Sequence, residues 1–217
     1  GADIGIALDG DADRCLMVTA EGREIDGDEI LYIIARQRLA AGTLSGPVVG
    51  TQMSNLGLEQ ALRKLGLDFQ RAAVGDRYVM EILKAKGGML GGETSGHTIC
   101  LDRTSTGDGT VTALQVLSAM VESGQSLAQL AAGMHKLPQV LINVRIHGAA
   151  KPLLAHPGVR ASVAAVEQQL AARGRVLLRA SGTEPLIRVM VEVDDAAQAQ
   201  RSAETIAEAV RQSALLA

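Results

Sequence analysis

The amino-acid sequence predicts an α/β protein, with a mixed, largely parallel α/β domain followed by a small α+β domain. Two observations lead to this prediction. Strand-like apolar runs alternate with helical periodicity through residues 25–137, which is typical of strand–helix–strand units around a mostly parallel sheet. From residue 138 onward the order becomes strand, helix, strand, strand and helix, which indicates a separate small domain. We expect the boundary near Leu137-Pro138.

The first elements along the chain are two apolar strands, at residues 3–8 and 15–19, which flank an acidic loop. The helices that follow carry apolar residues every three to four positions, and Asn or Gly residues at their ends are suitable caps. The expected strands of the α/β domain cover residues 47–51, 68–74 and 89–90. Three expected helices begin at residues 28, 56 and 76, and two more cover residues 108–123 and 127–135.

The expected elements of the second domain are three strands and two helices. The strands cover residues 140–147, 176–179 and 186–193, and the helices cover residues 157–173 and 196–215. A tight polar loop joins the last two strands, and no low-complexity segment interrupts the pattern.

Composition narrows the classes of function. The net charge is −3 and no block of five or six like charges occurs, so we expect neither nucleic-acid nor membrane partners. Aromatic residues make up 1% of the chain, so a bound sugar would be held mainly by hydrogen bonds. The two cysteines, Cys15 and Cys100, are interpreted as buried apolar residues, which fits a cytoplasmic protein.

The acidic loop places Asp9, Asp11 and Asp13 at alternate positions directly after an apolar strand. Carboxylates in this arrangement can converge on one hard cation, and Gly10 and Ala12 leave the space between them open. Two or three carboxylates together with a substrate phosphate suit Mg²⁺. The loop therefore predicts a magnesium site; the alternative is an acidic surface turn.

Two other metal-dependent motifs fit the acidic loop less well. An EF-hand that starts at Asp9 would need Gly and Glu where Arg14 and Ala20 stand. A haloacid-dehalogenase-type phosphatase also has Asp-x-Asp after a strand, and Gly107-Asp108-Gly109 could mimic the acidic motif that comes later in that family. However, residues 103–106, which precede it, do not resemble a buried strand.

A second loop, Gly91 to His97, carries an acid, a hydroxyl and an imidazole between glycines. Glu93 and Ser95 would match the hydroxyl or amine groups of a sugar. The alternative is an ordinary glycine-rich turn in which Ser95 caps the next segment. His97 is a structural hydrogen-bonding residue or a proton-transfer group.

A third loop runs from Arg179 to Pro185, with Arg188 shortly beyond it. Two hydroxyl residues around Gly182 can donate to an anion, and the two arginines can bind phosphate in a bidentate manner. The predicted phosphate-binding residues are Arg179, Ser181, Gly182, Thr183 and Arg188. The alternative is a plain hairpin loop.

Taken in order, the three loops resemble those of the α-D-phosphohexomutase superfamily. The matching motifs are Asp-Gly-Asp-Ala-Asp-Arg from Asp9, Gly-Glu-Thr-Ser-Gly-His from Gly92 and Arg-Ala-Ser-Gly-Thr-Glu-Pro from Arg179. Three further stretches, at residues 51–57, 74–79 and 187–192, resemble the phosphoglucosamine mutase family within it. Thr94 stands where the resemblance leads us to expect Gln. The resemblance covers essentially the whole chain.

The resemblance implies a four-domain protein of which this chain is the C-terminal half. Residues 1–24 would be the tail of the metal-binding second domain, residues 25–137 the third, and residues 138–217 a fourth domain with a TATA-box-binding-protein-like fold. The first domain, with its phosphoserine loop, would be missing. The missing N-terminal domains would therefore be partners of this chain, and we expect the chain alone to be inactive.

The reaction implied by the resemblance interconverts glucosamine 6-phosphate and glucosamine 1-phosphate through a bisphosphate and an enzyme phosphoserine. The three aspartates would hold Mg²⁺, and Arg14 would steady the phosphoryl group or the sugar. Glu93 and Ser95 would bind the sugar and the third loop its non-reacting phosphate, while His97 is one candidate for the general base. The alternatives are a phosphomannomutase/phosphoglucomutase, or a module that only binds phosphosugars.

Overall fold

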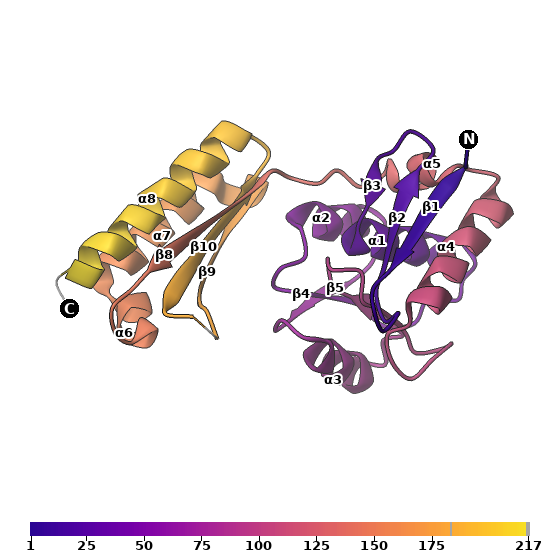
Figure 1. Ribbon diagram of the computed structural model, residues 1–217, viewed down its shortest axis with the longest axis horizontal. Helices are drawn as coiled ribbons and strands as arrows, with labels where there is room; N and C mark the ends of the chain where they lie inside the picture. Colours follow the sequence, from indigo (N-terminus) through magenta and orange to yellow (C-terminus); the bar gives the residue numbers. More distant parts are fainter. Residues whose placement is uncertain (183, 216–217) are drawn as a thin grey trace. The chain divides into compact units, whose positions relative to one another are not determined.

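The protein is described here by a computed structural model that covers residues 1–182 and 184–215. The chain divides into two compact units, Gly1–Lys136 and Leu137–Ala217 (Figure 1). The architecture is α/β with a mixed, largely parallel sheet in the first unit and a small α+β arrangement in the second, as the sequence predicted.

The first sheet of the N-terminal unit is antiparallel, with its strands in the order β1–β2–β3. Its strands are β1 (Ile4–Leu8), β2 (Cys15–Thr19) and β3 (Glu24–Ile25). β1 and β2 form a hairpin whose last pair is Leu8 and Cys15, so the acidic loop closes this hairpin. Cys15 and Met17 share one core with the residues of the first long helix. The assignment of residues 1–24 to a separate domain stays a prediction.

The second sheet has the order β5–β4–β6–β7. Its strands are β4 (Val48–Thr51), β5 (Phe69–Ala72), β6 (Leu90–Gly92) and β7 (Thr98–Cys100). β4 runs parallel to β5 and β6, whereas β7 is antiparallel to β6. The sequence did not predict β3 or β7, which have only two and three residues. β7 matters, because it turns the glycine-rich loop into the tip of a hairpin.

Five helices complete the first unit: α1 (Gly27–Ala40), α2 (Leu56–Lys64), α3 (Asp76–Lys86), α4 (Gly109–Ser123) and α5 (Leu127–Ala131). α1 packs against both sheets and is buried nearly all round along its first nine residues. Polar side chains at Asp26, Asn55, Asp108 and Ser126 cap the helices that follow them.

The expected helix over residues 127–135 is wrong at its end, since α5 stops at Ala131. The reason is a close approach between segments: a Cβ at Gly133 would lie 2.0 Å from the hydroxyl of Tyr32. The chain passes this tyrosine in a non-helical path that Gly133 permits.

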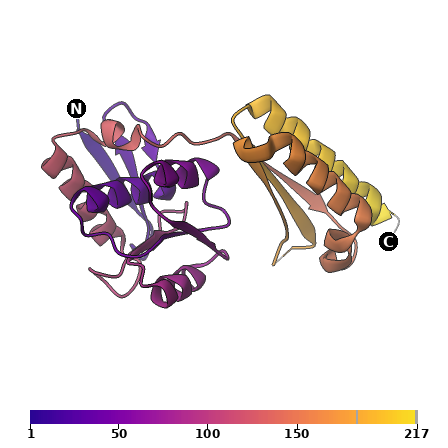
Figure 2. The same cartoon turned by 180° about the vertical axis from the view of Figure 1, so that it is seen from behind.

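The second unit is an antiparallel sheet in the order β8–β10–β9, with helices on one face (Figure 2). Its elements are β8 (Gln139–Arg145), α6 (Ala150–Ala155), α7 (Pro157–Leu170), β9 (Gly174–Ala180), β10 (Leu186–Val193) and α8 (Ala196–Leu215). The central strand β10 is buried along most of its length, and α8 packs against β8 and β10.

In this unit the ends of two predicted elements differ, and one helix was not predicted. The first strand ends at Arg145 instead of residue 147, and α6 was not expected because it is only six residues long and contains Pro152. The helix expected to reach residue 173 ends at Leu170, where Ala171 adopts a positive φ of 48° and a short 3-10 turn begins. No helix in the described parts of the two units is long and apolar enough to cross a membrane.

Candidate functional site

The acidic loop brings its three aspartates together. One carboxylate oxygen from each of Asp9, Asp11 and Asp13 lies within 4.8 Å of the others. Ala12 adopts the left-handed conformation, with φ 57°, and its N–H donates to the backbone oxygen of Asp9 at 3.1 Å. This tight turn is what places alternate side chains on one side of the loop. The donor set consists of oxygen atoms only, so the residues fit a hard cation such as Mg²⁺.

Arg14 organises the same loop from its end. Its backbone N–H donates to Oδ1 of Asp9 at 3.1 Å, and its guanidinium Nε lies 3.7 Å from Asp9 and 3.8 Å from Asp13. Desolvation acts to raise the pKa of Asp9, but the Arg14 N–H, Asp13 and the Arg14 charge outweigh it, so the pKa lies below its ordinary value. These contacts therefore favour the carboxylate form of Asp9.

The acidic loop also contacts the glycine-rich loop, which the sequence did not reveal. The N–H of Cys15 donates to the backbone oxygen of Gly96 at 3.1 Å, and Nδ1 of His97 lies 3.0 Å from Oδ2 of Asp13. On the other side, the N–H of Gly109 donates to the backbone oxygen of Ala12 at 2.9 Å. The candidate metal loop is thus held between two other segments of the same unit.

His97 is buried, with 6% of its surface exposed. Its Nδ1 faces Asp13, and among the described residues its Nε2 has no hydrogen-bond partner. A Cβ at Gly107 would lie only 2.2 Å from that Nε2, so the glycine leaves room for the ring. Of the two roles that the sequence left open for His97, this geometry favours the structural one: the imidazole orients the Asp13 carboxylate.

The candidate sugar loop is the tip of the β6–β7 hairpin. Glu93 is half-buried and its Oε1 accepts from the N–H of Gly75 at 3.0 Å, whereas Ser95 is exposed. Gly96 has φ 98°, and a Cβ there would lie 2.5 Å from the backbone oxygen of Cys15. The second glycine of the motif is therefore required by packing.

The candidate phosphate loop lies in the second unit, between β9 and β10. The strand register places Arg179 directly opposite Arg188. Oγ of Ser181 accepts from the N–H of Glu184 at 3.3 Å, and a Cβ at Gly182 would meet open space. No atom of the described chain therefore demands a glycine at residue 182. Thr183, which the sequence also predicted to bind phosphate, lies outside the described residues.

The two arginines of this loop form an unfavourable pair unless an anion binds between them. Desolvation and the charge of Arg188 lower the pKa of Arg179. Nε of Arg188 is buried and has no partner within the described chain, whereas Nη2 of the same side chain pairs with Glu184 at 3.6 Å. Like charges directly opposite in a sheet are destabilising. A phosphate would offset the repulsion and pair the buried Nε–H.

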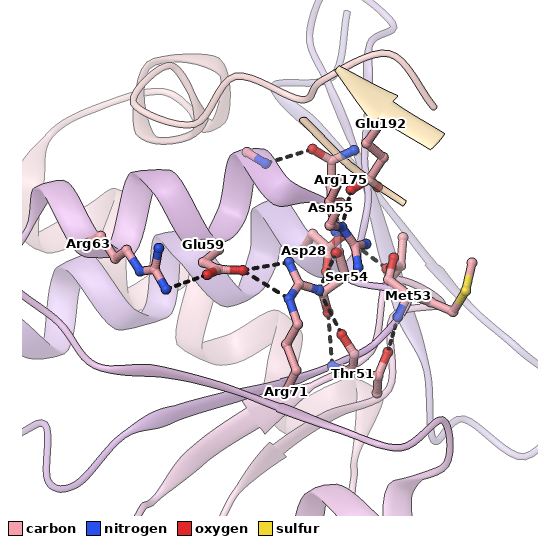
Figure 3. Close-up of polar contacts among 12 residues, drawn as sticks. Asp28, Thr51, Met53, Ser54, Asn55, Glu59, Arg63, Arg71, Arg175 and Glu192 are labelled. Atoms are coloured by element: carbon pink, nitrogen blue, oxygen red, sulfur yellow. Dashed lines mark hydrogen bonds and ion pairs between the residues drawn. The ribbon is translucent and has the colours of Figure 1, made fainter. Parts of the chain in front are cut away.

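Sequence reasoning missed a buried carboxylate beside the sugar loop. Asp28 is fully buried at the start of α1, where a run of acidic residues looked like ordinary helix capping. Figure 3 shows it among the polar residues around the start of α2, including Ser54, Asn55 and Arg71. Desolvation raises the pKa of Asp28 to about 6. Its place in the first turn of α1, next to Glu29, gave no local signal that this carboxylate is buried.

Comparison with known proteins gives two family matches and a set of relatives. The description "Phosphoglucomutase/phosphomannomutase, alpha/beta/alpha domain III" matches residues 26–137, and "Phosphoglucomutase/phosphomannomutase, C-terminal domain" matches residues 141–209. A phosphoglucosamine mutase of Alkalilimnicola ehrlichii is 60% identical over 212 residues, which are 98% of this chain and 47% of that protein. One of Methylococcus capsulatus is 59% identical over 209 residues, or 96% and 46% of the two chains.

Solved structures of lower identity share the fold. An Aspergillus fumigatus N-acetylphosphoglucosamine mutase, in complex with GlcNAc-6P and magnesium, has a TM-score of 0.76 at 23% identity, covering 94% of this chain and 51% of that one. A phosphoglucomutase/phosphomannomutase family protein of Burkholderia thailandensis also has a TM-score of 0.76 at 23% identity, covering 97% and 47%. The chain spans about half the length of the curated relatives it matches.

Proposed function

Because the chain belongs to the phosphoglucomutase/phosphomannomutase family, we propose that it is part of a mutase that interconverts glucosamine 6-phosphate and glucosamine 1-phosphate. The observation that carries this proposal is the similarity to phosphoglucosamine mutases at about 60% identity over nearly the whole chain. The three loops support it, because each presents groups of the kind that a metal, a sugar or a phosphate requires.

In this proposal the second unit holds the phosphate that does not react. Arg179 and Arg188 supply planar donors from adjacent strands, and Ser181 supplies a hydroxyl. Gly182 leaves space for a phosphate oxygen to approach the backbone. Thr183 keeps the same proposed role from the sequence.

The first unit orients the sugar and the charged groups around it. Glu93 accepts hydrogen bonds from sugar hydroxyls or an amine, and Ser95 donates or accepts beside it. Asp9, Asp11 and Asp13 would hold Mg²⁺, which, when bound, would neutralise negative charge on a nearby phosphoryl group. Arg14 adds a fixed positive charge at the same edge, and His97 keeps Asp13 in place.

The phosphoryl donor of this proposal, a phosphoserine, lies outside these 217 residues. None of the serines here stands in the sequence context that the family resemblance requires of a donor. We also propose a cytoplasmic location, with which the two free and buried cysteines agree.

Kinetics of the longer protein test the proposed substrate. We expect a higher kcat/KM for glucosamine 6-phosphate than for the phosphates of glucose and mannose. A preference for either neutral sugar would instead make the protein a phosphomannomutase/phosphoglucomutase.

The 217-residue chain alone tests the proposed division of labour. We expect no turnover, since positioning without a phosphoryl donor transfers nothing, but weak phosphosugar binding that Arg188→Ala reduces. Turnover by the purified chain would place a donor within these residues. If Arg188→Ala left phosphosugar binding unchanged, the phosphate site would have to lie elsewhere.

A further inference from the structure

A buried carboxylate lies directly behind the candidate sugar loop. Asp28, the second residue of α1, has no exposed surface. Its Oδ2 accepts two hydrogen bonds, from the backbone N–H of Asn55 at 2.8 Å and from the hydroxyl of Thr94 at 2.9 Å. Thr94 stands between Glu93 and Ser95 in the sequence, so one carboxylate oxygen joins the sugar loop to the segment that begins α2.

We propose that Asp28 is a positioning residue that acts through Thr94 to hold Glu93 and Ser95 in place for the sugar. This inference rests on the proposed function, because it assumes that the loop binds a hexose phosphate. Asp28 itself would touch neither the sugar nor a metal.

The candidate sugar loop packs closely against the first turn of α1. The N–H of Gly27 donates to the backbone oxygen of Thr94 at 3.1 Å. A Cβ at Gly27 would lie 2.0 Å from the backbone oxygen of Glu93 and 2.6 Å from the nitrogen of Gly96. The backbone of the loop therefore follows α1 closely, and the Asp28–Thr94 hydrogen bond fixes its middle residue.

Asn55, a second partner of Asp28, belongs to a segment that several contacts hold in place. Asn55 caps α2 through its side chain, which accepts from the N–H of Gly57 at 2.9 Å. Arg71 donates to the backbone oxygens of Thr51 at 3.0 Å and Ser54 at 2.7 Å, and Figure 3 shows its guanidinium among these groups. The same guanidinium is paired with Glu59 of α2 at 2.9 Å. Asp28 thus connects the tip of the β6–β7 hairpin to the segment before α2, which Asn55 and Arg71 stabilise.

A buried carboxylate at this position costs free energy of folding. Burying an ionised group is unfavourable, and desolvation raises the pKa of Asp28. An amide of the same shape could accept the same two hydrogen bonds, although more weakly. Local choices that oppose stability concentrate at functional positions. Thr94, whose hydroxyl donates to Asp28, stands where the family resemblance leads us to expect Gln.

A purely structural role for Asp28 makes a different prediction. A carboxylate at the start of α1 and beside the start of α2 also stabilises both helix dipoles. If that were its whole purpose, loss of the charge would lower the stability of the unit and leave the sugar loop unchanged. Glu29 is a matched control, because it is the next residue of the same turn, is 3% exposed and pairs with Arg23, away from the loop.

Hydrogen exchange in the 217-residue chain tests the anchoring. We expect Asp28→Asn and Thr94→Val to speed amide exchange of residues 92–97 about tenfold, since each weakens or removes one charge-assisted hydrogen bond. Thr94→Ser, which keeps the hydroxyl, should exchange like the parent, and Glu29→Gln should leave the loop unchanged. Equal exchange in Thr94→Val and the parent would overturn the proposal, even if Asp28→Asn did not fold.

Kinetics of the longer protein test the consequence for the sugar. For whichever hexose phosphate the parent uses best, we expect Asp28→Asn and Thr94→Val to raise KM about tenfold, Thr94→Ser to restore it, and Glu29→Gln to lower the melting temperature without changing KM. The identity of that best substrate tests the proposed function separately. An unchanged KM in Thr94→Val, together with faster loop exchange, would show that the anchor does not position the sugar and would overturn the inference.

Discussion

Replacing one of the two facing arginines of the second unit should stabilise the unit without phosphate and destabilise it with phosphate. Arg179 and Arg188 are direct cross-strand neighbours, and like charges so placed destabilise a sheet by about 0.2–1 kcal/mol. Without phosphate, Arg179→Gln should therefore raise the free energy of unfolding by about 0.5 kcal/mol. For a domain of this size that corresponds to a melting temperature about 2–4 °C higher. The lowered pKa of Arg179 does not change this at pH 7, because the penalty persists until the pH rises through that pKa.

Phosphate should invert the order of the two proteins. At a concentration 100 times its Kd, phosphate stabilises the parent by about 2.7 kcal/mol. Losing one charge-assisted contact weakens phosphate binding about tenfold or more. At the same concentration, phosphate then stabilises the variant by about 1.4 kcal/mol. Even with its intrinsic gain of about 0.5 kcal/mol, Arg179→Gln is then less stable than the parent.

Scanning calorimetry of the 217-residue chain, in chloride and in phosphate at one ionic strength, measures both orders. Arg173→Gln is the control, since it removes an arginine of the same unit that pairs with Asp194 at 3.2 Å on the exposed surface. We expect this variant to respond to phosphate like the parent. The reasoning is refuted if Arg179→Gln is the less stable protein in chloride, or if phosphate fails to raise the melting temperature of the parent.

Three further predictions concern the metal loop, the packing around His97 and the titration of Asp28. Asp11→Asn should abolish the weak binding of Mg²⁺ or Mn²⁺ that calorimetry detects in the parent chain, and unchanged binding would remove the aspartates from the metal site. Gly107→Ala should destabilise the first unit by about 1–3 kcal/mol in urea unfolding, because the new Cβ would lie 2.2 Å from the buried ring of His97. Gly182→Ala is the control: its Cβ would meet open space, so it should change the stability by less than about 0.5 kcal/mol. Since the pKa of Asp28 is raised, the stability that it contributes is present below pH 4 and is lost as the pH rises through about 6. The free energy of unfolding of the parent should therefore fall by up to about 3 kcal/mol relative to that of Asp28→Asn between these limits. Parallel pH profiles of the two proteins would contradict this.

Much of the fold could be predicted because its signals are local. The long helices and the strands at residues 15–19 and 186–193 have apolar periods that follow from backbone geometry alone. The elements that were missed or misplaced have no such signal. α6 and β7 are too short for a period, and α5 ends early because Gly133 must pass the hydroxyl of Tyr32.

The sequence alone determined which chemical groups each loop carries. Alternate aspartates after a strand, a glutamate between glycines, and two arginines around Ser-Gly-Thr are spacings along a covalent chain, and they can be read without knowing what lies nearby. The family membership that these motifs indicated was confirmed by the comparisons.

Only the tertiary structure decided which of these groups meet. The pairing of Asp13 with His97, 84 residues away, and of Asp28 with Thr94, 66 residues away, depends on how helices and sheets pack. The facing of Arg179 and Arg188 depends on the register of a hairpin, which a slip of one residue would change. Local periodicity contains no information on such contacts, because they arise only when distant apolar faces are buried against one another.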